Sequence, residues 1–447
     1  MALPIAPSPT TITSAVCVSE PTARILEQLA RRRAAVAEAW GLTDEIVLIG
    51  AGDPIGILGG ADLTYPFRAH SEYYYLTDRN RPGCVLAFDP HGGWFDYVPP
   101  VTESDRLWSG APDGELDGLP LPELDGWLKA RSGRPVACLG TPPAAIEFDA
   151  DLSAELQFGL NDVRRAKDTV ELARMRAAER ATRAAFAVAR QLLEDGVTER
   201  QVQIELEAEA LRRGGDAMAY DTIIASGPNS AVLHCAPTAR RMRAGELVLI
   251  DAGAACAGYA SDITRTYPVG GVLDPEQREL HSLVRASQLA AIERCTAGTE
   301  WREVHLTAAR VIAEGLVAFG LLRGRPDALI EAGAAWLFFP HGIGHLLGLG
   351  VRDAAGPLRE RRDQAAPYPS LRIDLPLRSG MVVTVEPGVY FVPAILRDPE
   401  RRQLHHDVVD WDRVDRMIGF GGIRLEENVL VTDGGHEVLT ADVPLLG

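Results

Sequence analysis

The apolar positions in the first third of the chain predict one helix followed by several short strands. From Thr22 to Trp40 the apolar residues recur at helical spacing, after an opening rich in Pro, Ser and Thr. Four β-rich runs separated by Gly, Pro and Asp turns follow, at residues 45–52, 71–78, 83–90 and 93–100. Strands mixed with a helix in this way predict a self-contained α/β domain, which we place at residues 1–158.

A long stretch rich in Ala, Arg and Leu, at residues 162–196, opens the second part of the chain. Its apolar positions form a helical stripe, in which Met175 is predicted to be a core residue. Beyond residue 215 the sequence is rich in predicted strands, interrupted by helical stretches near 275–298 and 301–320. We therefore expect a second domain at residues 159–447 and an α+β fold class for the chain.

Two β-rich runs, residues 247–253 and 259–269, flank a Gly258-Tyr259 turn and predict a hairpin. Asp251 lies in the first run and Asp262 in the second, each among apolar and small residues. A carboxylate in a strand suited to burial is costly unless it is paired, hydrogen-bonded or bound to a metal. Two such acids on facing strands would repel each other, and a shared cation would remove that conflict. The hairpin therefore predicts half of a two-metal site.

The segment at residues 338–356 contains two histidines four positions apart, His341 and His345. Such a pair occurs on one helix in zinc proteases of the HExxH type. Here the glycines between and after the histidines make a regular helix improbable, and no Glu follows His341. We therefore expect at most one histidine to be a metal ligand and the other to help orient the ligands through hydrogen bonds.

Two further strand-like segments contribute glutamates. In the segment at residues 381–391, alternation predicts that Glu386 ends a buried strand. In the segment at residues 420–431, alternation places Arg424 and Glu426 on one face and Glu427 on the other. Glu426 is therefore the candidate ligand, and Glu427 is predicted to be a solvated charge.

The candidate metal ligands share a chemistry that suits divalent cations. Four carboxylates and one imidazole form an oxygen-rich set appropriate for Mn²⁺, with Co²⁺ or Zn²⁺ as alternatives. Four negative charges balance two divalent ions, and a metal pair can hold and deprotonate a shared water. The ligand set is Asp251, Asp262, His345, Glu386 and Glu426.

The composition of the chain excludes some classes of binding partner. Acidic residues outnumber basic ones 62 to 45, for a formal charge of −17, which argues against a nucleic-acid-binding surface. No apolar run is long enough for a membrane span, and the N-terminus lacks the pattern of a signal peptide. The six cysteines show no CxxC pairing and are predicted to be reduced thiols. We therefore expect a cytoplasmic enzyme that contacts neither membrane nor nucleic acid.

The motifs around Asp251 and Asp262, and at residues 341–353, 384–391 and 421–428, resemble the pita-bread metallopeptidases in order and spacing. That superfamily includes methionine aminopeptidases, aminopeptidase P, prolidase and creatinase. The chain is most similar to the Xaa-Pro dipeptidases, or prolidases. The resemblance implies an N-terminal creatinase/prolidase-like α/β domain, a C-terminal domain of curved antiparallel sheet covered by helices, and a homodimer that hydrolyses Xaa-Pro dipeptides.

The resemblance also implies roles for the metal ligands. Asp262 and Glu426 would bridge the two ions, and His345 and Glu386 would bind one of them. A water deprotonated between the ions would be the nucleophile. Glu386 would in addition act as the general base that takes up and returns its proton.

Further site residues follow from the same resemblance. His234 would lie near the scissile bond, and Tyr220 would line the substrate pocket. We also count His341, the neighbour of the predicted ligand His345, among the candidate catalytic residues. Arg424 would order Glu426, with other acids of the site as further partners. Arg372 would grip the free carboxylate of a dipeptide, since a planar guanidinium matches a carboxylate in two hydrogen bonds and so measures substrate length.

One position departs from the family pattern. Where the family usually has a histidine in a Val-His-Asp context, this chain has Arg352 between Val351 and Asp353. An arginine can still donate hydrogen bonds to the substrate, but it cannot act as a neutral imidazole. Arg352 could therefore reduce turnover or add a second carboxylate contact. Two alternatives stay open: an aminopeptidase P acting on longer Xaa-Pro peptides, and a low-activity or non-catalytic peptide-binding homologue.

Overall fold

A computed structural model describes residues 22–60, 63–110, 118–141, 146–361 and 370–445. Residues 1–21, which sequence composition indicates to be an extended arm rich in Pro, Ser and Thr, lie outside this part. The chain divides into two compact units between Arg165 and Ala166, whereas composition placed the boundary at residues 158/159. The difference arises because α5 (Ala150–Arg165) is one uninterrupted helix, so the change in composition falls within it. Directly after α5, Ala166 forms a β-bridge with Met381 of the second unit.

The N-terminal unit is built on one five-stranded sheet of order β4-β3-β2-β1-β5. Strand pairing is parallel for β1–β5 and β3–β4 and antiparallel for the other two pairs. The elements of the unit are α1 (Thr22–Trp40), β1 (Ile46–Gly50), α2 (Ser71–Thr77), β2 (Val85–Asp89), β3 (Gly93–Val98), α3 (Glu103–Ser109), β4 (Leu119–Pro120), a 3₁₀ turn (Leu121–Glu123), α4 (Leu124–Lys129), β5 (Val136–Gly140) and α5.

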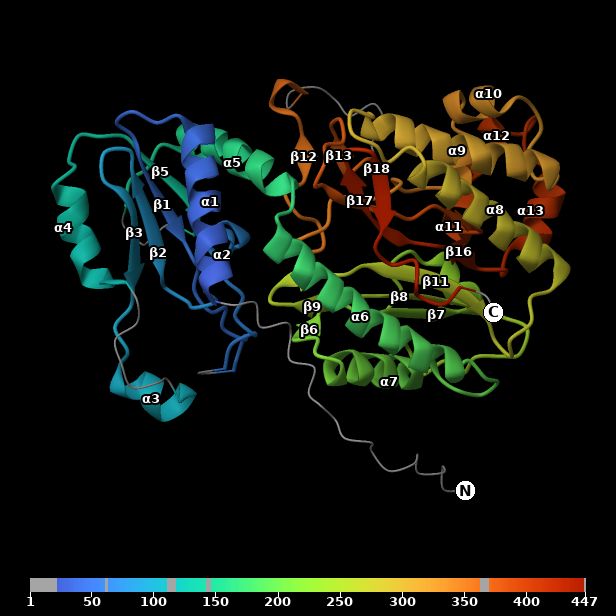
Figure 1. Cartoon of the computed structure of the whole chain (residues 1–447). Coiled ribbons are helices and arrows are strands. Elements are labelled where there is room, and N and C mark those ends of the chain that lie inside the picture. The colour runs from blue at the N-terminus through green and yellow to red at the C-terminus, as the bar shows by residue number, and fades with distance from the viewer. Residues whose placement is uncertain (1–21, 61–62, 111–117, 142–145, 362–369, 446–447) are drawn as a thin grey trace. The chain divides into compact units, whose positions relative to one another are not determined.

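Different helices lie on the two faces of this sheet, as Figure 1 shows. On one face Leu48 belongs to a buried cluster with Leu124 of α4. On the other, the ring of Trp40 from α1 lies 5.8 Å from those of Phe88 and Trp94. The sheet is therefore covered on both faces, as expected for an α/β domain.

The run at residues 71–78, predicted as a strand, is the helix α2. Tyr73 and Leu76, three positions apart, are fully buried on the inner face of this helix. Asp78 ends it in a left-handed conformation with φ of 55°. The three consecutive tyrosines favour a strand by propensity, but burial at helical spacing outweighs that local preference.

The C-terminal unit contains short, mostly antiparallel sheets and most of the helices. Its helices are α6 (Thr169–Gln191), α7 (Glu199–Arg212), α8 (Pro275–Ile292), α9 (Trp301–Ala318), α10 (Pro326–Glu331), α11 (Pro393–Leu396), α12 (Pro399–Leu404) and α13 (Trp411–Met417), with 3₁₀ turns at Gly227–Ala231, Ala335–Leu337 and Arg359–Arg361. Its strands are β6 (Ala217–Met218), β7 (Ile223–Ser226), β8 (Leu247–Ala252), β9 (Ala254–Cys256), β10 (Tyr259–Ala260), β11 (Ile263–Pro268), β12 (Gly356–Pro357), β13 (Ile373–Asp374), β14 (Val382–Val385), β15 (Gly388–Tyr390), β16 (Gly422–Arg424), β17 (Glu427–Thr432) and β18 (Gly435–Val438).

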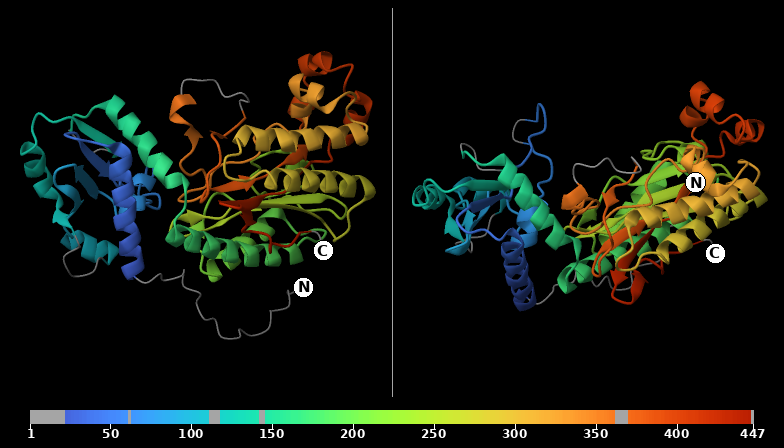
Figure 2. Two further views of the ribbon diagram at one scale, coloured as in Figure 1. Left: turned by 45° about the horizontal axis from the view of Figure 1, so that its top comes forward. Right: turned by 90° about the horizontal axis from the view of Figure 1, so that it is seen from above.

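Helices cover the sheets of this unit from two sides. The strand orders are β11-β8-β7, β10-β9-β6, β14-β17-β18 and β15-β16, all antiparallel, with a parallel β12-β13 pair beside them. Helices α6 and α7 pack on β7, β9 and β10, whereas α8 packs on β14, β15 and β16, as the views in Figures 1 and 2 agree. The α+β class and the helix-covered antiparallel sheet expected for this unit are confirmed.

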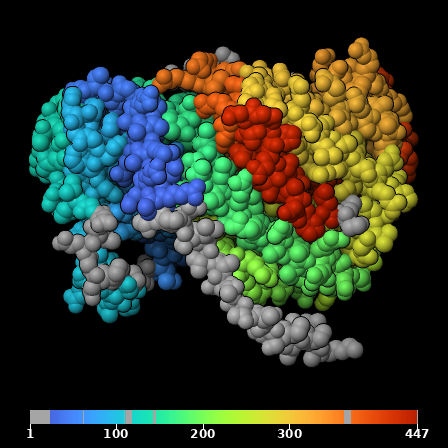
Figure 3. All heavy atoms as spheres, in the orientation of Figure 1, coloured from blue at the N-terminus to red at the C-terminus, as the bar shows by residue number. Residues whose placement is uncertain are grey.

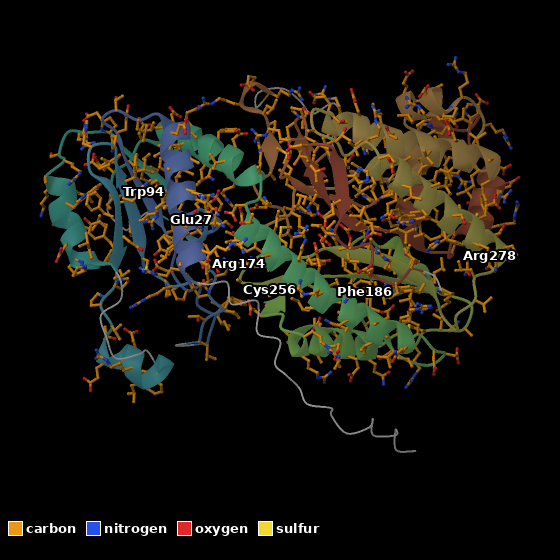
Figure 4. All side chains as sticks on the ribbon, in the orientation of Figure 1. Glu27, Trp94, Arg174, Phe186, Cys256 and Arg278 are labelled. Carbon is orange, nitrogen blue, oxygen red and sulfur yellow. The ribbon has the colours of Figure 1, made fainter. Side chains whose placement is uncertain are left out.

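The core of the C-terminal unit bears out the predicted helical stripe. Met175 and Phe186 on α6 are both fully buried, and Figure 4 marks Phe186 among the side chains that face the strands. At the surface, β18 lies beside α6 (Figure 3), where Arg176 donates to Glu437 at 2.7 Å. Thr198 and Gln201 form the capping box of α7.

The cysteines only partly match the sequence expectation. Cys84, Cys138, Cys235 and Cys295 have free thiols, but Cys256 takes part in a disulfide, so the prediction of six reduced thiols is wrong for that residue. Cys17 lies outside the described residues.

Among the helices of the described part, none combines the length and the apolar character that crossing a membrane requires.

Candidate metal centre and substrate cavity

The predicted hairpin places the first two acids side by side. In the β8–β11 ladder, Thr264 is paired with Asp251, and Asp262 immediately precedes β11. Asp251 and Asp262 are 9% and 5% exposed. The two chain segments approach closely here, because a Cβ on Gly253 would lie 1.8 Å from the carbonyl oxygen of Ser261. A glycine at this position is therefore a steric requirement of the site.

The Tyr220 hydroxyl lies between the two aspartates. Its oxygen is 2.6 Å from Asp251 Oδ1 and 2.5 Å from Asp262 Oδ1. A hydroxyl has one proton to donate, so it satisfies one carboxylate at a time. Burial and the charge of Asp251 raise the pKa of Asp262 well above its usual range, although the hydrogen bond from Tyr220 opposes this shift.

The segment that predicted a broken helix presents His345 to the acids. Its Nδ1 lies 3.1 Å from the Leu346 carbonyl oxygen, which fixes the proton there and leaves Nε2 unprotonated. Nε2 is 3.5 Å from Asp262 Oδ2 and 3.8 Å from Glu386 Oε1. Burial lowers the pKa of His345, and a neutral imidazole is the form that ligates metal.

Glu386 and Glu426 complete the set from two different strands. Glu386 follows β14, and burial together with the charge of Glu426 raises its pKa to about 8. Glu426 lies between β16 and β17, where the Thr264 hydroxyl donates to its Oε2 at 2.7 Å. Burial and the nearby Asp262 raise the pKa of Glu426 well above the ordinary range.

The donor set fits divalent cations. The ligand atoms of Asp262, His345 and Glu426 all lie within 4.8 Å of one another, and the three residues are buried. Two further acids lie next to this group. Asp251 shares the Tyr220 hydroxyl with Asp262, and Glu386 Oε1 lies 3.8 Å from His345 Nε2. Like charges held this close raise one another's pKa, and divalent cations among them would offset the repulsion.

Arg424 contacts one of the site acids directly. Its Nη2 lies 2.5 Å from Asp251 Oδ2, its Nη1 donates to the Tyr390 hydroxyl at 3.0 Å, and its Nε donates to the Thr264 hydroxyl at 3.2 Å. Thr264 in turn donates to Glu426, so among the described residues the hydrogen-bonded connection of Arg424 to Glu426 is indirect. Such a forked donor fixes the orientation of its carboxylate partner.

His341 supports the site without joining the ligand group. Its Nδ1 lies 2.9 Å from the Gly342 carbonyl oxygen, and its Nε2 lies 2.9 Å from the Tyr390 hydroxyl. Burial lowers its pKa to about 3, so the ring is neutral and its Nε2 accepts the Tyr390 proton. Tyr390 in turn accepts from Arg424, which completes a hydrogen-bonded chain from His341 to Asp251.

Every candidate site residue lies on the wall of one cavity of about 790 Å³. Four of the candidate ligands and Arg424 are buried, whereas Glu386, His341 and Tyr220 are half-buried beside them; we call these residues together the buried part of the cavity. His234, Arg352 and Arg372 line the same cavity and are exposed. The structure thus brings the whole predicted set together, while the individual roles stay predictions.

The prediction for Glu427 is wrong. This residue is 1% exposed, and both of its carboxylate oxygens lie 3.0 Å from Nη2 of the fully buried Arg265. The Thr440 hydroxyl donates to it at 2.6 Å. Because β17 is buried on both faces, alternation could not separate an inward from an outward position.

Sequence reasoning did not identify Thr264, Thr384 and Tyr390. Thr264 connects Glu426 to Arg424, Tyr390 connects Arg424 to His341, and the Thr384 hydroxyl accepts from the backbone N–H of His345 at 3.1 Å. Thr384 and Tyr390 are polar residues in otherwise apolar strands, and Thr264 lies two positions after the candidate ligand Asp262. That position was the available signal for a residue supporting the site.

Comparisons with known proteins place the chain in a family. The model of metallopeptidase family M24 matches residues 173–433, and that of the aminopeptidase P N-terminal domain matches residues 29–119. The probable Xaa-Pro aminopeptidase of Botryotinia fuckeliana is 31% identical over 397 residues, which cover 86% of each chain. A second one, from Fusarium vanettenii, is 32% identical and covers 87% of each.

Solved structures agree with this assignment. Aminopeptidase PepP of Pseudomonas aeruginosa is 29% identical with a TM-score of 0.75, over 94% of this chain and 95% of that one. Aminopeptidase P of Escherichia coli with the inhibitor Pro-Leu has the same identity and coverage and a TM-score of 0.77. Its zinc-substituted form in complex with product has a TM-score of 0.76 at 28% identity, over 94% and 96% of the two chains. The chain belongs to metallopeptidase family M24.

Proposed function

We propose that the protein is an Xaa-Pro aminopeptidase, which removes the N-terminal residue from peptides with proline in second position. The observation that carries the proposal is the single cavity in which five candidate ligands meet the neutral His341 and the exposed His234. The relatives named above support this activity over that of a dipeptidase, because they resemble the chain along most of its length, including the N-terminal domain.

The metal chemistry follows from the donor set. Bound divalent cations would supply a Lewis acid and a water that is deprotonated near neutral pH. Asp251, Asp262, His345, Glu386 and Glu426 would hold them, and we propose Mn²⁺ as the physiological ion, ahead of Co²⁺ and Zn²⁺. Arg424 and Tyr220 orient Asp251 from opposite sides, so this carboxylate is positioned before any ion binds.

Glu386 is the residue best placed to move protons. It lines the cavity, and its side chain is 19% exposed, whereas the side chains of Asp251 and Asp262 are 12% and 7% exposed. Its carboxylate can accept a proton from the attacking water and return it to the departing nitrogen. That return is required in the hydrolysis of any peptide bond, because the nitrogen takes the electron pair of the broken C–N bond and must be protonated to leave as an amine.

Arg372 is the residue on which the dipeptidase and aminopeptidase predictions differ. The dipeptidase prediction assigned it to the free carboxylate of an Xaa-Pro dipeptide. The residue is exposed at the cavity wall, a position compatible with a peptide that continues past proline.

The expected homodimer and the cytoplasmic location stay predictions.

The deciding experiment compares Ala-Pro with Ala-Pro-Ala and Ala-Pro-Ala-Ala, using metal-stripped protein with and without Mn²⁺. We expect metal-dependent release of alanine from the longer peptides, with the dipeptide cleaved more slowly. Cleavage confined to Ala-Pro would return the protein to the dipeptidases. No cleavage of any peptide by the native protein, but cleavage by Arg352→His, would identify a homologue that Arg352 has made inactive.

A further inference from the structure

The wall of the cavity carries two arginines whose charges are unpaired. Arg352 and Arg372 are exposed, and within the described residues neither guanidinium has a hydrogen bond or an ion pair. By contrast, Arg200 on the same wall donates to Gln203 Oε1 and to the Pro237 carbonyl oxygen. Arg352 and Arg372 therefore have donors available for a ligand.

The backbone that carries Arg352 is held firmly. The carboxylate of its neighbour Asp353 lies 2.7 Å from Lys167 Nζ, and the two side chains are 1% and 0% exposed. The backbone N–H of Asp353 donates to the Leu346 carbonyl oxygen at 3.1 Å. Because Asp353 points into the protein and Arg352 is exposed, the fold presents Arg352 from a fixed base.

Both free arginines are close to the ligand segment. Arg352 follows the ligand His345 by seven positions, and both residues line the cavity. The chain just before Arg372 lies against the same segment, because a Cβ on Gly342 would lie 2.5 Å from the carbonyl oxygen of Ser370. Both cations therefore lie on the wall of the cavity that a substrate would enter.

The charge balance of the cavity favours an anionic substrate. The four buried carboxylates would be balanced by two divalent cations, as their number suggests. Of the exposed residues on the wall, Asp221 is acidic, whereas Arg352 and Arg372 are both basic. A loaded cavity would thus attract negative charge at its exposed part.

We propose that Arg352 is a specificity-determining residue that, together with Arg372, makes the protein prefer peptides carrying a carboxylate on the proline side of the cleaved bond. The inference rests on the proposed function. An aminopeptidase removes one residue, so the longer part of its substrate leads outward past the exposed wall. The carboxylate has two sources: the free C-terminus of a short peptide or an acidic side chain after proline.

The test uses the Mn²⁺-loaded protein and five peptides. Ala-Pro-Ala against Ala-Pro-Ala-amide measures the terminal carboxylate. Ala-Pro-Glu-amide against Ala-Pro-Gln-amide measures the side-chain carboxylate, and Ala-Pro-Lys-amide tests repulsion. We expect roughly tenfold higher kcat/KM for the carboxylate member of at least one pair, mainly through KM, as a charge-assisted hydrogen bond provides. Raising the salt concentration should reduce the ratio.

Three variants separate a role in specificity from a structural one. Arg352→Gln should bring the ratio close to one, and Arg352→Lys should retain part of it. Arg401→Gln, which removes an exposed arginine outside the cavity, should leave it unchanged.

Equal cleavage of charged and neutral peptides, or a preference that survives Arg352→Gln, would overturn the inference and leave the aminopeptidase activity standing. Failure to cleave any of the five peptides would instead contradict the proposed function itself.

Discussion

The charged side chains in the buried part of the cavity have partners, and the two arginines compared with them in the exposed part do not, within the part of the chain that the structure describes. In the buried part each of the four acids has a neighbour that can pair with it. Asp251 has Arg424, Asp262 has Tyr220, Glu426 has Thr264 and Glu386 has His345. In the exposed part Arg352 and Arg372 have none among the described residues.

This difference separates two kinds of function. A buried charge is costly unless its neighbours compensate for it, so substitution in the buried part should affect metal binding and stability together. An exposed charge contributes little to the free energy of folding, so such a residue can be replaced to suit a different substrate without loss of stability. We therefore expect chemistry to depend on the buried part and specificity on the exposed part.

Asp262→Asn should have the largest effect. It removes a ligand that belongs to the closest donor group while keeping the size of the side chain. The expected loss in kcat/KM exceeds roughly 100-fold, because residues that only support a ligand already cost about 10–100-fold. Metal content and peptide hydrolysis measure it, with the exposed Asp407→Asn as control. Normal metal content in the variant would contradict the assignment.

Metal-stripped protein should lose stability as pH rises from about 5 to about 8. Glu386 has a pKa raised to about 8, so the folded chain holds its proton more tightly than the unfolded chain does. The stability is present at low pH and is lost through the folded pKa, by on the order of a few kcal/mol. Denaturant melts at several pH values measure the slope.

Two controls sharpen that measurement. Glu386→Gln and added Mn²⁺ should each flatten the slope. Glu179, buried on α6 with its pKa also raised to about 8 by burial, contributes a slope that metal should not alter. A slope unaffected by both Mn²⁺ and Glu386→Gln would show that the buried acids of the cavity are not its source.

Arg424→Lys should weaken metal binding by about 10–100-fold, the usual cost of losing an outer partner of a ligand. A lysine keeps the charge, but its single ammonium cannot contact both Asp251 and Tyr390 as the guanidinium does. Competition with a chelator measures the affinity, and Arg401→Lys is the matched control. Unchanged affinity would mean that Asp251 is not oriented by Arg424.

Arg352→His should have the smallest effect, on the order of a tenfold change in kcat, because it replaces one hydrogen-bond donor on the exposed wall by another. We expect faster cleavage of neutral peptides and the same metal affinity, since the residue is not in the ligand group. Steady-state kinetics on Ala-Pro-Ala-amide measures it. A large change in metal affinity would break the separation between the two parts of the cavity.

Local pattern predicted a large share of this molecule. The Asp251–Asp262 hairpin and α1 depend on residues close together in the sequence, and both are present. Local pattern failed where long-range burial decided the outcome. The tyrosines of α2 are helical because tertiary packing selects that face, and Glu427 is buried because Arg265 meets it across the sheet.

The sequence by itself determined which residue types could bind metal, because an acid in an apolar strand or a histidine among glycines carries that information locally. It also revealed the departure at Arg352. Tertiary structure alone decided that Arg424 contacts Asp251, that Tyr390 links Arg424 to His341, and that two guanidiniums remain unpaired at the cavity wall among the described residues. Those pairings join residues more than 30 positions apart, and the distance between such side chains is set by packing, which no local pattern records.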